Sequence, residues 1–96
     1  MEEKKQQRQK LEPNVVLVAR KPISAYILAA KKIKENHDCI IMKARGKNIN
    51  VLVNLAEILK RDDKLKLKDL SINSETMMTD EGREVYVSGM VIILEK

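Results

Sequence analysis

Basic side chains cluster at two points where an apolar run is followed by an amphipathic one. The first point is Lys43-Ala44-Arg45-Gly46-Lys47-Asn48, and the second is Arg20-Lys21, just before Pro22. Lysine and arginine donate strong charged hydrogen bonds to phosphate oxygens. The free N–H groups at the start of a helix also favour anions, and Asn48 is expected to cap the helix that follows it. The two corners therefore predict a surface that binds phosphate. The residues expected to contribute are Arg20, Lys21, Lys43, Arg45, Gly46, Lys47 and Asn48.

The flanking sequence predicts the elements that hold these corners. Residues 14–19 are apolar and largely β-branched, which favours a strand covered on both faces. Residues 39–42 predict a second buried strand. A helix is expected after each strand, the first opening near Pro22 and the second spanning residues 49–59. A crossover of this length implies that the two strands are parallel neighbours with a right-handed connection.

The last third of the chain predicts two strands, at residues 65–79 and 83–94, joined by a turn in which Gly82 can adopt a positive φ. The apolar positions change parity near Lys68-Asp69, which indicates a β-bulge or an irregular strand start. Alternating lysines favour an edge position for the first strand, whereas the continuous apolar run 91–94 favours an interior position for the second. The outer half of the hairpin provides little core. We therefore predict a projecting arm that reaches a duplex groove with Arg83 at its tip; an ordinary flexible hairpin is the alternative.

The second helix carries two apolar stripes. One comprises Ile49, Leu52, Val53, Ala56 and Leu59, and the other comprises Val51, Leu55 and Ile58. A single sheet covers only one such stripe, and an exposed branched stripe on a small protein usually marks an interface. The pattern predicts a homodimer with Val51, Leu55 and Ile58 at its interface. Wider burial within the monomer is the alternative.

The composition sets limits on the class of protein. The chain has 96 residues, which fits one domain; we expect it at residues 13–96, after a flexible tail at residues 1–12. The net charge of +5 fits a polyanionic partner. Aromatic residues make up only 2% of the chain, which disfavours base stacking on aromatic platforms and favours duplex or backbone binding. The apolar runs are too short to cross a membrane. With a single cysteine, Cys39, and no secretory leader, a cytoplasmic protein is expected.

No residues in the sequence form a recognisable catalytic group. We find no nucleophile paired with a base, no cluster of metal ligands and no phosphate-binding loop of the P-loop type. A non-enzymatic protein is therefore expected, with no cofactor, no metal and no small-molecule substrate.

Four segments of the sequence together resemble the Alba family of archaeal chromatin proteins. They are NVVLVARKP at 14–22, YILAA at 26–30, IMKARGKNI at 41–49 and DEGR at 80–83. The resemblance implies an α/β fold of the two-layer α+β type. Its order would be β-α-β-α-β-β with a mixed four-stranded sheet, similar to the C-terminal domain of bacterial translation initiation factor 3. It also implies a homodimer that binds double-stranded DNA and RNA largely without sequence preference, associated with the chromosome in the cytoplasm.

The resemblance also implies roles for individual residues. Arg20 and Lys21 match the family's central basic pair near the phosphate backbone, Arg45 matches the arginine of its KARG-type motif, and Arg83 matches the hairpin arginine that enters a minor groove. Two features depart from the pattern. Arg20 replaces a lysine whose acetylation weakens DNA binding, and the chain lacks the phenylalanine with which some members pack dimers side by side.

The residues and the resemblance lead to one mechanism, in which a symmetric dimer lies across a duplex and contacts its phosphates. Such contacts give affinity without reading the base sequence. The nearest alternative is an RNA-binding ribonucleoprotein subunit or RNA chaperone, in which the same surface binds an A-form helix.

Overall fold

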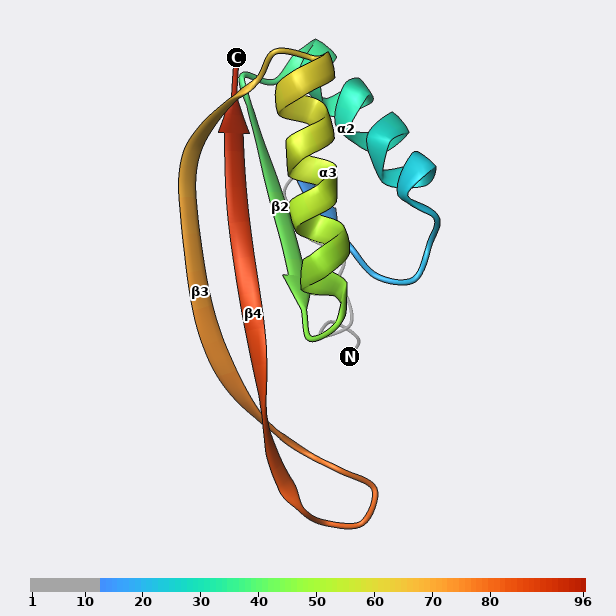
Figure 1. The fold of residues 1–96 in the computed structure, drawn as a ribbon, viewed down its shortest axis with the longest axis vertical. Coiled ribbons are helices and arrows are strands. Elements are labelled where there is room, and N and C mark those ends of the chain that lie inside the picture. The colour runs from blue at the N-terminus through green and yellow to red at the C-terminus, as the bar shows by residue number, and fades with distance from the viewer. Residues whose placement is uncertain (1–12) are drawn as a thin grey trace, which may run out of the picture.

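The computed structural model describes residues 13–96, so the expected tail at residues 1–12 lies outside the described part. The chain forms a β-α-β-α-β-β fold with two helices and a mixed four-stranded sheet (Figure 1), which confirms the expected architecture. The strand order is β1-β2-β4-β3, with β1 parallel to β2 and the other pairs antiparallel. The elements are β1 (Val15–Leu17), α2 (Ile23–Asn36), β2 (Cys39–Arg45), α3 (Asn48–Asp62), β3 (Lys66–Met78) and β4 (Glu84–Glu95).

Both helices pack on the same face of the sheet (Figure 1), which makes the domain two-layered. Alternate residues of β2, namely Ile40, Met42 and Ala44, are buried beneath the helices, and they pair in register with Leu94, Ile92 and Met90 of β4. The opposite, open face carries no described helix. The expectation that the first strand is covered on both faces is therefore wrong: Val16 is buried, but its neighbour Leu17 is 49% exposed.

Helix α3 buries one apolar face that combines residues from both predicted stripes. Its buried residues are Leu52, Leu55, Ala56 and Leu59, which recur at spacings of three and four residues. Leu55 is fully buried within the single chain, where α3 packs against the sheet and against α2, so it cannot form a contact between chains. Val53, expected to face the sheet, is instead 37% exposed. The structure therefore agrees with wider burial in the monomer, at least for Leu55.

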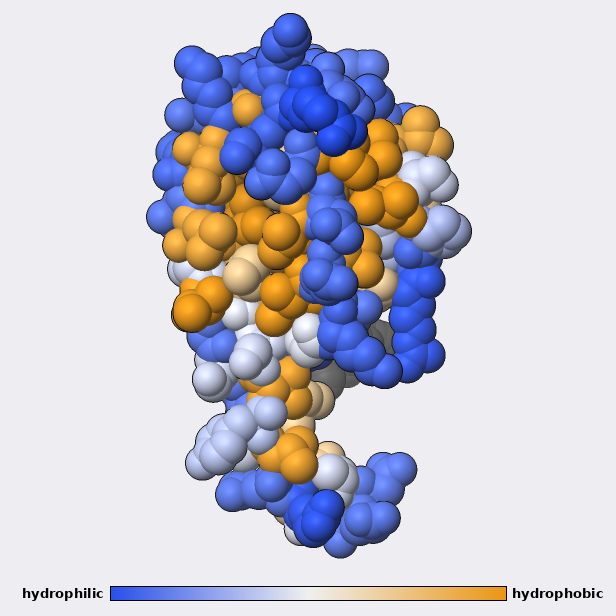
Figure 2. Space-filling model, viewed as in Figure 1, coloured by the Kyte–Doolittle hydropathy of each residue, from blue (hydrophilic) through white to orange (hydrophobic). Residues whose placement is uncertain are grey.

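Strands β3 and β4 occupy the positions expected of them, with β3 at an edge and β4 inside the sheet. The register shifts between Leu67 and Asp69, which confirms the irregularity predicted there. Because of this shift, Leu67, Leu70 and Ile72 pair with Leu94, Ile92 and Met90, which face the helices. Helix α3 packs over β2 and β4 rather than β3, and these three side chains are 49%, 47% and 70% exposed. We call them the β3 strip; Figure 2 shows apolar surface along this side of the helix layer.

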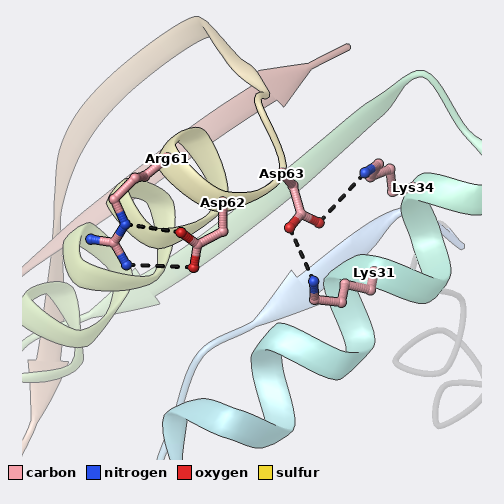
Figure 3. Close-up of polar contacts among 5 residues, drawn as sticks. All are labelled: Lys31, Lys34, Arg61, Asp62 and Asp63. Atoms are coloured by element: carbon pink, nitrogen blue, oxygen red, sulfur yellow. Dashed lines mark hydrogen bonds and ion pairs between the residues drawn. The ribbon is translucent and has the colours of Figure 1, made fainter.

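A buried carboxylate ties the ends of the two helices together (Figure 3). The Asp63 side chain is 5% exposed and receives Lys31 Nζ at 3.0 Å and Lys34 Nζ at 3.6 Å. Neighbouring Asp62 is instead exposed, and the hydrogen bond from the Arg61 guanidinium lowers its pKa. Helix α3 continues through Arg61 and Asp62, beyond the end at residue 59 that the sequence predicted.

We expect Asp63→Asn to lower the free energy of unfolding by about 1–2 kcal/mol, measured by urea denaturation. The figure is below that for a fully buried ion pair because the two lysine side chains are 49% and 35% exposed to solvent. Asp62→Asn is the matched control, since that carboxylate is 53% exposed. An equal effect of the two substitutions would contradict a structural role for the Asp63 pairs.

Candidate nucleic-acid interface

The two basic corners lie at the same end of the sheet because β1 and β2 are parallel neighbours. Leu17 pairs with Lys43, and the Val18 N–H donates to the Lys43 carbonyl at 2.8 Å, so the two strands end side by side. Arg20 and Lys21 follow β1, whereas Lys43 to Lys47 close β2. Arg20, Lys21, Lys43, Arg45, Gly46 and Lys47 are all exposed, and Asn48 is half-buried. The structure thus brings together the residues predicted at the two corners, and we call this end the basic edge.

The start of each helix lies at the basic edge without a capping side chain. Neither α2 nor α3 has a side-chain cap hydrogen bond, and neither has an acidic residue in its first turn. The expected cap at Asn48 is wrong, because Asn48 is the first helical residue and Lys47 occupies the cap position. In the first turns, the N–H groups of Ala25 and Ile49 donate to the carbonyls of Pro22 and Gly46. The helix starts, with no side-chain cap, lie at the basic edge, where their positive ends favour anions.

Gly46 joins the second corner to the arm. Its φ of +58° lies in the left-handed region that favours glycine, and this conformation turns the chain from β2 into α3. The Gly46 N–H donates to the Ser88 carbonyl of β4 at 2.8 Å. One pair further back, Arg45 lies opposite Gly89. The corner is thus hydrogen-bonded to the base of the β3–β4 hairpin.

The hairpin extends beyond the body of the domain at the basic edge (Figure 1). Its strands pair without interruption from Asn73–Gly89 to Met78–Glu84, past the point where β2 ends. Arg83 lies in the exposed turn, where the backbone N–H of Arg83 donates to Thr79 Oγ1 at 3.1 Å. Asp80, Glu81 and Glu84 are exposed around it. Arg83 therefore lies on the arm, apart from the other basic residues, with acidic neighbours.

Tyr26 holds the first basic corner in place, a role that its sequence pattern did not reveal. This buried side chain belongs to the apolar face of α2, and its hydroxyl accepts the backbone N–H of Ala19 at 2.7 Å and that of Lys21 at 3.0 Å. The two bonds flank Arg20 and fix the backbone that presents the basic pair. A buried tyrosine hydroxyl needs a hydrogen-bond partner, and this requirement is the feature of the sequence from which the role of Tyr26 could have been predicted.

Within residues 13–96, no group of three or more histidine, cysteine, aspartate or glutamate side chains is arranged to hold a metal ion. No helix in that range is long and apolar enough to span a membrane.

Comparisons with known proteins agree with this geometry. Residues 14–74 match the family model of Alba. The fold is similar to that of Alba from Thermoplasma volcanium, with a TM-score of 0.78 and 32% identity, over 86% of this chain and 100% of that one. It is also similar to the crystal structure of ALBA1 from Trypanosoma brucei, with a TM-score of 0.74 over 91% of this chain and 72% of that one; at 19% identity this likeness concerns the fold alone. Both basic corners lie inside the matched range. The family match and the 32% identity show that the chain belongs to the Alba family, a family of nucleic-acid-binding proteins.

Proposed function

We propose that the protein is a dimeric, double-stranded-DNA-binding architectural protein that coats or compacts DNA without strong sequence preference and also binds RNA. The observation that carries this proposal is the basic edge. Two exposed basic corners, two uncapped helix starts and a projecting hairpin lie at one end of the sheet. The proposed role is binding rather than catalysis. Because its partner is DNA, we place the protein at the chromosome in the cytoplasm.

Phosphate contacts from the body supply most of the binding free energy in this proposal. Arg20, Lys21, Arg45 and Lys47 are exposed, and each can reach a backbone phosphate as the duplex lies along the edge. The first-turn amides of α2 and α3 add donors there. Because phosphates are the same at every base pair, these contacts give affinity and orientation without sequence preference.

The arm adds a contact outside the body. Arg83 lies in its turn and is the only basic residue among 75–84, which also hold Glu75, Asp80, Glu81 and Glu84. Four carboxylates against one guanidinium give this segment a charge of 1 − 4 = −3. A narrow minor groove attracts an inserted arginine, whereas carboxylates are repelled from phosphates. We therefore assign Arg83 a minor-groove contact and the surrounding acids a weakening effect on it.

The β3 strip supports the homodimer in this proposal. Its three side chains continue the hydrophobic core sideways past α3, and Ile72 is 70% exposed in the single chain. Branched apolar groups in a contiguous, uncovered row on a small protein favour association. A second copy of the chain would bury both strips against each other across a two-fold axis, the commonest symmetry of homo-oligomers. Val51 and Ile58, each half-buried, remain candidates for the interface, whereas Leu55 does not.

The test is a fluorescence-anisotropy titration of labelled DNA and RNA duplexes at several salt concentrations. Four basic side chains per subunit correspond to roughly 4 to 8 neutralised phosphates per dimer, so we expect log K to fall with log salt with a slope of about −4 to −7. Two unrelated DNA sequences should bind with similar affinity. No binding to either duplex at low salt would contradict the proposal. A clear preference for the RNA duplex would instead favour a ribonucleoprotein subunit or an RNA chaperone.

A further inference from the structure

The open face of the sheet is hollowed beside the basic edge. A cleft of about 470 Å³ lies over the ends of β1, β2 and β4, within the range of roughly 300–1,000 Å³ found for small-molecule sites. Gly89 is at its floor, between Arg45 on β2 and Asn73 on β3 in the sheet register. A Cβ atom on Gly89 would approach Asn73 Oδ1 to 2.6 Å, so glycine is needed for the Asn73 side chain to lie where it does.

The cleft is lined by groups of three kinds. Lys43 and Arg45 provide positive charge on the side of the basic edge, and Leu17 and Val91 provide apolar surface, with Leu17 49% exposed. The side-chain amides of Asn48 and Asn73 provide hydrogen-bond donors and acceptors; because Asn73 lies over Gly89, its amide is available to a group resting on the floor. Cations suit a phosphate, an apolar surface suits the face of a base, and an asparagine amide suits a base edge.

An ion pair crosses the cleft at its arm end. Arg45 Nη1 donates to Glu75 Oε1 at 2.8 Å, joining β2 to β3 over the intervening strand β4. The two side chains are 54% and 51% exposed, so the pair is accessible to a competing phosphate. A phosphate in the cleft can exchange with the Glu75 carboxylate for the Arg45 guanidinium, which leaves Glu75 free to accept a hydrogen bond from an exocyclic amino group.

We propose that this cleft binds one unpaired nucleotide of the nucleic acid held at the basic edge, with its phosphate on Lys43 and Arg45 and its base on the apolar surface beside Asn73. The inference rests on the proposed function, since Lys43 and Arg45 belong to both surfaces. A paired base cannot enter the cleft, because its flat faces are stacked and its Watson–Crick edge is occupied. Extruding it costs free energy, which is least for a base that is already unpaired.

The test compares a perfect RNA duplex with the same duplex carrying a single-nucleotide bulge, by anisotropy at matched salt. We expect the wild-type protein to bind the bulged duplex three- to tenfold more tightly, a modest gain because unstacking costs part of the new contacts. Asn73→Ala should remove that preference and leave the affinity for the perfect duplex unchanged. Asn54→Ala is the matched control, because Asn54 is exposed on α3 and does not line the cleft.

A second measurement does not depend on a variant. With 2-aminopurine as the bulged base, its fluorescence should rise when the protein binds, since no aromatic side chain lines the cleft to quench it. Equal affinity of the wild-type protein for both duplexes, or a bulge preference that survives Asn73→Ala, would overturn the inference while leaving duplex binding intact. Failure to bind either duplex would overturn the inference together with the proposed function.

Discussion

We expect Ile72→Asp to convert the dimer into monomers and to lower the affinity for a DNA duplex by roughly 100-fold. A dimer engages the duplex with two basic edges, and separating the subunits removes the gain from binding both at once. Because Ile72 is 70% exposed in the single chain, the substitution leaves no cavity in the monomer core. Instead, it places a charge where two apolar strips would meet. Sedimentation and light scattering report the mass, and anisotropy reports the affinity.

Leu28→Asp is the matched control for that experiment. Leu28 is 66% exposed, lies on α2 rather than on the β3 strip, and its replacement adds the same negative charge. The control should remain dimeric and keep most of its affinity, which separates the loss of the interface from the added charge. A monomeric wild-type protein, or an Ile72→Asp protein that is still dimeric, would contradict the role of the β3 strip.

Replacing Arg20 and Lys21 together by alanine should weaken duplex binding by roughly 100-fold at about 0.1 M salt. The double substitution removes four cations from a dimer, so the salt slope should become shallower by about 3 to 4. Both side chains are exposed, and the hydrogen bonds from Ala19 and Lys21 to the Tyr26 hydroxyl involve the backbone, so the corner keeps its shape. Anisotropy titrations over a salt series measure both quantities.

The control pair for the basic corner is Lys32→Ala with Lys66→Ala. Both lysines are exposed. Lys66 pairs with Glu95 at the opposite end of β4 from the corners, and Lys32 lies in the C-terminal half of α2, away from the start of that helix at the basic edge. The control removes the same net charge from the chain. If it changed the salt slope as much as the Arg20 and Lys21 double substitution did, binding would depend on overall charge rather than on the basic edge.

The sequence was most informative about features that depend on one strand or one connection between strands. The parity change at Lys68-Asp69 predicted the register shift, because side chains alternate between faces along a single strand. The parallel pairing of β1 and β2 followed from the crossover length, and it placed both basic corners at one edge. In these cases the physical constraint lies within one strand or one connection between strands.

The sequence was less informative where several elements share a surface. Helix α3 carries more apolar positions than one face can bury, and only its packing against β2, β4 and α2 decides that Leu55 is buried whereas Val53 is exposed. Leu17 lies on an uncovered face because both helices lie on the other one, and residue type does not specify that choice. Asn48 was expected to cap α3, but the left-handed Gly46 lets the helix begin one residue earlier. The cleft depends on Gly89 lying between two side chains from different strands.

The projecting hairpin has a consequence for hydrogen exchange. Every residue of β3 is exposed, and beyond the body only β4 pairs with it. A two-stranded ribbon is marginally stable by itself, so amide protons of its outer part should exchange through local opening rather than through global unfolding. A substitution that destabilises the core would then leave exchange in the hairpin unchanged. If adding a duplex slowed exchange only at the outer amides of the hairpin, this would show directly that the hairpin binds in a groove.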